Sequence, residues 1–330
     1  MLVGVKRTLN IEEVVKIPRL DLCESSNWFL DSLKFVKTLG QGGFGVVSHF
    51  SSRLNNKEYA VKQLNHHMDP LMKYKEHTLL RLANNNKFIT KLYGSFNVEG
   101  SVLLVMEYLP GGTLSKYIHQ AGRFAEEEAR FYAAEIICGL EYLHKKRIVH
   151  RDLKPDNLLL DAKGHVRLSD FGLSDVFFGQ DKFREVSGTV PYMAPEMLFR
   201  VPYDEAIDWW SFGITLYEML TGQRPFENDS DNKLIEFILY AVPPQPGYLT
   251  YEAKDCLTKL LKKNPLRRLG YKGSCNPFIR CHPFFRSIDW EMAEEMELIP
   301  PPNKVAISQS SQSSAANDYV SGFSDLLDDL

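Results

Sequence analysis

The chain has 330 residues, of which 44% are apolar, and its formal net charge at pH 7 is −3. A chain of this length can bury a large core and exceeds the usual size of one domain, so we expect two lobes. The lack of a strongly basic block argues against nucleic acid as the main partner, and no apolar run approaches the roughly 18 residues that a membrane span needs.

The cysteines and the N-terminal residues indicate a cellular compartment. The five cysteines show no paired or metal-type spacing, which suggests a reducing environment. They are Cys23, Cys138, Cys256, Cys275 and Cys281. The apolar run at the start of the chain is too short for the core of a signal peptide. We therefore expect a cytoplasmic protein, with access to the nucleus left open. Within the first thirty residues, Ile11 to Lys16 have the spacing of a short amphipathic helix that Pro18 would end.

A glycine-rich segment follows a strand pattern that starts at Leu33. Gly40, Gly42 and Gly45 form G-x-G-x-x-G, which alone is weak evidence because it also opens dinucleotide-binding helices. The residues after it are β-branched and apolar up to Phe50, which favours a second strand. We expect a hairpin that lies over phosphates, in which backbone N–H groups approach the oxygens without an intervening Cβ.

The next two elements supply a lysine and a carboxylate. Glu58 to Lys62 reads as a strand that places Ala60 and Lys62 on one face, where a small residue leaves room for a purine and a lysine reaches its phosphates. The alternative is a surface lysine at a strand end. Asp69-Pro70 predicts the start of a helix that runs through Ala83. Glu76 on this helix is the expected partner of Lys62, or else an ordinary exposed glutamate.

A small sheet and a joining segment complete the first half. We expect strands from about Phe88 to Phe96 and from Ser101 to Met106, followed by a connection at Glu107-Tyr108-Leu109. Pro110-Gly111-Gly112 is the break after it. The chain beyond is mostly helical, and apolar residues at three- and four-residue steps predict a core helix from about Glu126 to Lys146.

The residues that carry the chemistry come next. His150-Arg-Asp-Leu-Lys-Pro-Asp-Asn157 precedes Asp170-Phe171-Gly172 by a short apolar run. Two carboxylates, a lysine and an asparagine at this spacing suit a site that holds Mg²⁺ and a triphosphate beside a hydroxyl nucleophile. The alternative, a solvated polar loop, would require both matches to arise by chance. Farther on, the long polar segment from Gly172 to Pro195 has the composition of a functional loop, and Glu196 and Arg268 are candidates for a buried ion pair.

From about Leu33 to Phe285 the sequence resembles a eukaryotic protein kinase. The resemblance implies an α+β, bilobal fold with a small antiparallel-sheet N-lobe holding one main helix and a larger, mostly helical C-lobe. It divides the chain into an extension (1–32), a kinase domain (33–285, with N-lobe 33–106, hinge 107–109 and C-lobe 110–285) and a tail (286–330). Phe284 to Trp290 and Ile299-Pro-Pro-Pro302, together with Asp208-Trp209-Trp210, are similar to the AGC group, especially the cyclic-AMP- and cyclic-GMP-dependent kinases.

The resemblance also implies roles for single residues. Asp152 would accept the proton of a Ser or Thr hydroxyl, Lys154 would neutralise the moving phosphoryl group, and Thr189 would complete the catalytic set with Lys62 and Glu76. Asn157 and Asp170 would bind Mg²⁺. The residues expected to bind ATP are Leu39, Gly40, Gln41, Gly42, Gly43, Phe44, Gly45, Val46, Val47, Ala60, Lys62, Met106, Glu107, Leu109, Asn157, Leu159 and Asp170.

Two departures from the family concern the activation loop and the substrate. Glu185 stands where the family has its activating phosphothreonine, so it either pairs with Arg151 and holds the loop ready or simply faces solvent. Asp175 replaces a residue that is often basic, and Ser187 remains a candidate phosphorylation site.

The second departure is at Thr113, which replaces an acidic residue that reads an arginine three positions before the acceptor. Asp156 and Glu218 match two other acidic positions, so we expect some preference for basic protein substrates.

The sequence is compatible with more than one mode of regulation and with two alternative functions. Thirty residues before Leu33 cannot form a cyclic-nucleotide-binding domain, so the sequence predicts either control by a separate regulatory subunit or inhibitor, or freedom from such control. Near the end of the chain, Phe323 and Leu326 are candidates to dock on the small lobe, and Tyr319 to approach the nucleotide. A pseudokinase scaffold and a small-molecule phosphotransferase of the same fold are the two alternatives to a protein kinase.

Overall fold

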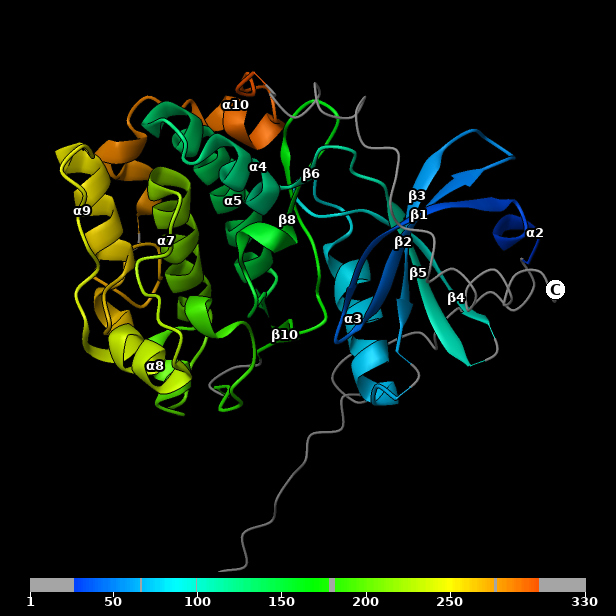
Figure 1. The fold of residues 1–330 in the computed structure, drawn as a ribbon, viewed down its shortest axis with the longest axis horizontal. Helices are drawn as coiled ribbons and strands as arrows, with labels where there is room; N and C mark the ends of the chain where they lie inside the picture. Colours follow the sequence, from blue (N-terminus) through cyan, green and yellow to red (C-terminus); the bar gives the residue numbers. More distant parts are fainter. Residues whose placement is uncertain (1–26, 66, 99, 178–181, 276–277, 303–330) are drawn as a thin grey trace, which may run out of the picture.

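The computed structural model describes residues 27–302, apart from 66, 99, 178–181 and 276–277. A small lobe built on a sheet stands beside a larger, mostly helical lobe, as the sequence predicted (Figure 1). The helix expected at Ile11–Lys16 and the tail residues Tyr319, Phe323 and Leu326 lie outside the described residues.

The small lobe is a five-stranded antiparallel sheet in the order β1-β2-β3-β5-β4. Its strands are β1 (Leu33–Gly42), β2 (Gly45–Ser52), β3 (Glu58–Leu64), β4 (Leu92–Val98) and β5 (Ser101–Glu107), preceded by the short helix α2 (Asn27–Leu30). Helix α3 (Pro70–Ala83) begins where Asp69 accepts a hydrogen bond from the Leu71 amide, so the predicted cap is confirmed. The glycine-rich segment is the tip of the β1-β2 hairpin, where Gly42 pairs with Gly45.

The prediction of a strand from Phe88 was wrong, because the strand begins at Leu92. The amide of Leu168 donates to the carbonyl of Phe88 at 2.7 Å, and the Thr90 amide donates back to Leu168 at 2.9 Å. These residues therefore pair with β9 (Val166–Leu168) of the large lobe and join the two halves of the molecule. Alternation of side chains along the sequence cannot distinguish which strand a segment pairs with.

The large lobe is built around α5 and α7. Its helices are α4 (Leu114–Ala121), α5 (Glu126–Lys145), α6 (Pro195–Leu198), α7 (Ala206–Thr221), α8 (Asp231–Tyr240), α9 (Tyr251–Leu260) and α10 (Trp290–Glu295). The polar segments of this lobe are flanked by five short strands: β6 (Gly112–Thr113), β7 (Ile148–Val149), β8 (Leu158–Leu160), β9 and β10 (Asp175–Val176). The 3₁₀ turns lie at Pro155–Asn157, Val190–Tyr192, Pro265–Arg267, Ile279–Cys281 and Pro283–Phe285. The predicted core helix is confirmed as α5.

The tail begins on the large lobe. Ala293 of α10 is buried in a cluster with Cys138 of α5 and Phe88, and Lys87 forms an ion pair with Glu295 at 2.6 Å. The Tyr117 hydroxyl donates to the carbonyl of Pro302 at 3.4 Å, which is the end of the described chain. Among the helices that the structure describes, none combines the length and the apolar character that a membrane crossing requires.

Candidate active site

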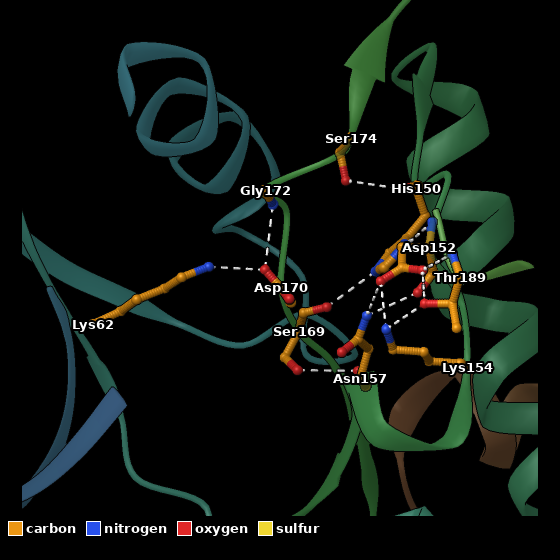
Figure 2. A network of polar contacts seen from close by, with 10 residues as sticks. All are labelled: Lys62, His150, Asp152, Lys154, Asn157, Ser169, Asp170, Gly172, Ser174 and Thr189. Carbon is orange, nitrogen blue, oxygen red and sulfur yellow. Dashed lines mark hydrogen bonds and ion pairs between the residues drawn. The ribbon is translucent and has the colours of Figure 1, made fainter. Parts of the chain in front are cut away.

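Lys62 on β3 lies between two carboxylates from different parts of the fold. Its Nζ atom donates to Glu76 Oε1 of α3 at 2.6 Å and to Asp170 Oδ1 at 2.8 Å. Lys62 and Glu76 are buried, whereas the Asp170 side chain is 34% exposed. The sequence predicted that Glu76 would be the partner of Lys62, and the structure brings these two residues together. Figure 2 shows Lys62 extending from the small lobe toward Asp170.

Lys62 and Asp170 stabilise each other's charges. Burial by itself would lower the pKa of Lys62, but the neighbouring carboxylates of Glu76 and Asp170 outweigh it, so the lysine pKa is raised. For Asp170, burial would raise the pKa, but the charge and hydrogen bond of Lys62 lower it, and the net shift is downward. A cationic lysine beside an ionised aspartate at neutral pH suits the recognition of an anionic ligand that also carries a divalent cation.

Asp152 lies at the centre of a second polar group on the large-lobe side. Its Oδ1 atom accepts hydrogen bonds from the Thr189 amide at 2.9 Å and the Thr189 hydroxyl at 2.8 Å. Its Oδ2 atom accepts from Lys154 Nζ at 2.7 Å and from the Asn157 side chain at 3.1 Å. Lys154 also donates to the Thr189 hydroxyl at 2.6 Å. Figure 2 shows these side chains gathered around Asp152.

The backbone around Asp152 is held by a buried carboxylate that the sequence reasoning did not single out as functional. Asp208 of α7, which is fully buried, accepts hydrogen bonds from the amides of His150 at 2.9 Å and Arg151 at 3.0 Å, and contacts the His144 ring at 2.8 Å. Arg151 has a left-handed backbone with φ of 68°. Non-glycine residues in this region cost about 1–3 kcal/mol, so surrounding bonds must enforce the conformation. A charged residue inside an otherwise apolar helical segment was the signal available in the sequence.

Asn65 is a second residue that the sequence reasoning missed. Its side chain donates to the carbonyl of Gly43 at 2.8 Å, and its amide donates to the carbonyl of Phe44 at 3.2 Å. Gly45 has φ of 148°, and a Cβ there would lie 2.0 Å from the carbonyl oxygen of Gln63. The hairpin tip therefore requires glycine at Gly45 and is tied to the end of β3. Nothing in the sequence pattern pointed to Asn65.

The predicted nucleotide-binding residues line up on neighbouring strands. Ala60 of β3 pairs with Met106 of β5, so these two residues lie side by side next to the connection between the lobes. Leu109 is buried in this connection, and Glu107 accepts a hydrogen bond from the Lys91 amide at 2.7 Å. The predicted hinge residue Glu107 is thus the last residue of β5. Leu159 comes from β8 on the large-lobe side.

The side chains of Asn157 and Asp170 fit a magnesium ion. Carboxylate and amide oxygens are hard ligands, and Mg²⁺ is usually held by one or two carboxylates together with substrate phosphates and water. Asn157 and Asp170 are brought close through Ser169, whose amide donates to the Asn157 carbonyl at 2.9 Å. Asp170 has a left-handed backbone with φ of 60°, a strained conformation typical of functional positions. Within the described part of the chain, no three His, Cys, Asp or Glu side chains form a ready-made metal cluster.

The expected substrate-binding carboxylates lie near each other. Glu218 on α7 accepts a hydrogen bond from the Tyr192 hydroxyl at 2.6 Å. Burial raises the pKa of Glu218, and the negative charge of nearby Asp156 raises it further. Asp156 is exposed. Thr113 is the N-cap of α4, where its hydroxyl accepts from the Lys116 amide at 3.3 Å, so it brings no charge to this surface.

Arg151 contacts each of the expected activation-loop residues. Its Nε donates to the Ser187 hydroxyl at 3.1 Å, and its Nη2 lies 3.5 Å from Glu185 Oε2. The Glu185 side chain is 84% exposed, so solvent screens this pair. A third group, Asp175, accepts from Arg151 Nη1 at 3.0 Å. The sequence showed Asp175 only as a replacement for a residue that is often basic, whereas the structure places it in direct contact with Arg151.

Comparisons with known proteins agree with this geometry. A model of the protein kinase domain matches residues 33–285. Protein kinase C delta type of Rattus norvegicus is 41% identical over 278 residues, covering 82% of this chain and 41% of that protein. The cAMP-dependent protein kinase type 3 of Saccharomyces cerevisiae is 38% identical over 284 residues, covering 84% of this chain and 71% of that protein. The chain thus spans about two fifths of the length of the protein kinase C relative.

Proposed function

The chain belongs to the protein kinase family and, within it, to the AGC group, and on that premise we propose that it transfers the γ-phosphoryl group of ATP to Ser or Thr residues of protein substrates. The observation that carries the proposal is the contact at 2.8 Å between Lys62 of β3 and Asp170, which lies 108 residues farther along the chain, on the segment that also holds Asp152 and its partner Asn157. A pseudokinase usually lacks one of these groups, and this chain has all of them with matching partners.

The nucleotide is oriented by the small lobe. Lys62, fixed by Glu76, binds the α- and β-phosphates, and the backbone of the Gly42–Gly45 hairpin covers the phosphates. Asn157 and Asp170 would hold Mg²⁺, which supplies positive charge to the phosphate oxygens when it is bound. Position and charge, rather than covalent chemistry on the enzyme, lower the barrier.

The proton and the phosphoryl group move at Asp152 and Lys154. The substrate hydroxyl oxygen forms a bond to the γ-phosphorus while the bond to the β–γ bridging oxygen breaks, so that ADP leaves. Asp152 accepts the hydroxyl proton, and Thr189 and Asn157 orient its carboxylate. Lys154, 2.7 Å from Asp152, places its charge beside the transferred group.

One assay tests the proposal against its two alternatives. The chain is incubated with labelled ATP, Mg²⁺ and a basic serine peptide, with Asp152→Ala as the control. Transfer to the peptide that Asp152→Ala loses supports a protein kinase. Transfer only to small molecules would contradict it in favour of a small-molecule phosphotransferase, and no transfer at all would favour a scaffold.

Substrate preference follows from the charges near the acceptor. Asp156 and Glu218 attract a basic residue, whereas Thr113 carries no charge. We expect an arginine two residues before the acceptor to raise kcat/KM more than an arginine three residues before it. A peptide array with single arginine substitutions measures both effects, and the reverse order would reject this assignment.

Glu185 is proposed to help hold the activation loop without phosphorylation. Its ion pair with Arg151 spans 3.5 Å and is largely solvated, and exposed pairs contribute about 0–1 kcal/mol. We therefore expect Glu185→Ala to lower turnover by roughly two- to fivefold. The comparison uses both proteins free of phosphate, as shown by mass spectrometry. Equal turnover numbers would show that Glu185 does not help to hold the activation loop.

A cytoplasmic location and a separate regulatory partner stay predictions of the sequence. Fractionation of cells that express the tagged chain tests the first, and affinity purification with the intact chain tests the second.

A further inference from the structure

The side chain of Asp175 lies between two cations from different lobes. Its Oδ2 atom accepts hydrogen bonds from Arg151 Nη1 at 3.0 Å and from Lys75 Nζ of α3, and its Oδ1 atom accepts from the Val176 amide at 2.8 Å. The Arg151 side chain is 3% exposed, and those of Asp175 and Lys75 are only about a quarter exposed. Solvent therefore screens this group much less than it screens Glu185.

The position of Asp175 is fixed by backbone pairing within the large lobe. Asp175 and Val176 form β10, which pairs with Val149 and Ile148 of β7 directly before the catalytic loop. The Phe177 amide continues this pairing by donating to the carbonyl of Arg147 at 3.1 Å. The carboxylate is thus carried by a segment that is hydrogen-bonded to the residues just before the loop that holds Asp152. Figure 1 shows β10 on the side of the large lobe that faces α3.

Lys75 connects this carboxylate to the helix that orients Lys62. It is the neighbour of Glu76 on α3, and successive residues on a helix point about 100° apart. Glu76 therefore contacts Lys62 on the sheet side, while Lys75 reaches Asp175 on the large-lobe side. Because Lys75 and Glu76 are adjacent on one helix, a displacement of α3 that separates Glu76 from Lys62 would also move Lys75 relative to Asp175.

We propose that Asp175 is a positioning residue that ties α3 to the catalytic loop by bridging Lys75 and Arg151. The bridge keeps Glu76 against Lys62 and keeps Arg151 in place beside Ser187, without a phosphate on the activation loop. Its catalytic consequence rests on the proposed kinase function. In this arrangement the Asp175 carboxylate of β10 supplies the negative charge between Lys75 and Arg151. Glu185 adds a second, solvent-exposed negative charge next to Arg151.

The test removes each half of the Lys75–Asp175 contact. Asp175→Asn, Lys75→Met and the double variant are compared for kcat on a basic serine peptide and for hydrogen exchange of the backbone amides in residues 70–83. Asp175→Glu, which retains the charge, is the conservative variant. We expect Asp175→Asn and Lys75→Met each to lower kcat about tenfold and to speed amide exchange in α3. The double variant should lose no more kcat than Asp175→Asn, because each single substitution already removes the Lys75–Asp175 contact. Asp175→Glu should recover most of the activity.

A matched control comes from another lysine–carboxylate pair. Lys87→Met removes the pair with Glu295, which lies away from the catalytic residues, and should leave kcat and α3 exchange unchanged. Unchanged kcat and exchange in Asp175→Asn and Lys75→Met would overturn the proposal, as would multiplicative losses in the double variant. If Asp175→Asn does not fold, Lys75→Met carries the same test with Arg151 still paired. If the unmutated chain transfers no phosphate, the kinase function fails, and the exchange measurement alone decides whether the bridge restrains α3.

Discussion

Replacing Asp152 with alanine should lower the turnover number for peptide phosphorylation by about a hundred- to ten-thousand-fold, the usual effect of losing a positioned general base. The carboxylate is the proton acceptor in the proposed mechanism, and its four hydrogen bonds from Thr189, Lys154 and Asn157 hold it in one orientation. Lys62 and Asp170 are untouched, so nucleotide affinity should change little. Initial rates with labelled ATP and nucleotide titration by calorimetry measure the two quantities.

The matched control for this prediction is Asp229→Ala. Asp229 is an exposed aspartate on the segment before α8, so the same substitution there should leave turnover unchanged. Circular dichroism of both variants checks that the fold is retained. A turnover number of Asp152→Ala within tenfold of the unmutated protein, with unaltered affinity for the peptide, would contradict the role of Asp152 as proton acceptor.

Replacing Arg268 with leucine should lower the free energy of unfolding by about 3–5 kcal/mol, which is the usual cost of leaving one member of a buried ion pair without its partner. The sequence predicted this pair, and the structure confirms it. Arg268 is fully buried and donates to both carboxylate oxygens of Glu196, at 2.6 and 2.9 Å. It also donates to the carbonyls of Ala206 at 2.8 Å, of Lys262 at 3.1 and 3.2 Å and of Lys263 at 3.3 Å, so six hydrogen bonds are lost together. Urea denaturation followed by fluorescence measures the change.

Two variants make the stability experiment specific. Arg286→Leu removes a pair with Glu252 in which the arginine side chain is 78% exposed, and it should cost no more than about 1 kcal/mol. Adding Glu196→Leu to Arg268→Leu should recover part of the loss, because the uncompensated buried carboxylate is then removed. An effect of Arg268→Leu no larger than that of Arg286→Leu would show that burial of this pair does not matter for stability.

Local sequence rules were sufficient for elements whose signals lie within one segment. Asp69 and Pro70 begin α3 because a side-chain oxygen and a proline satisfy the first turn of a helix wherever it occurs. The glycines of the hairpin and the placement of Ala60 and Lys62 on one strand face were also predictable from the sequence, since backbone freedom and strand periodicity are local properties. The spacing of Asp152, Asn157 and Asp170 indicated the chemistry because all three lie on one short stretch.

Pairing between distant segments was decided only by the tertiary structure. The residues from Phe88 to Thr90 pair with Leu168 rather than with the small sheet, and no pattern within either segment specifies that partner. Asp208 supports the catalytic loop from a helix about sixty residues away, and Lys75 meets Asp175 a hundred residues along the chain. The sequence by itself determined which groups were available for chemistry and where helices and strands begin. Their mutual distances, burial and charges depended on long-range packing, because such contacts arise only when the two lobes have formed and lie against each other.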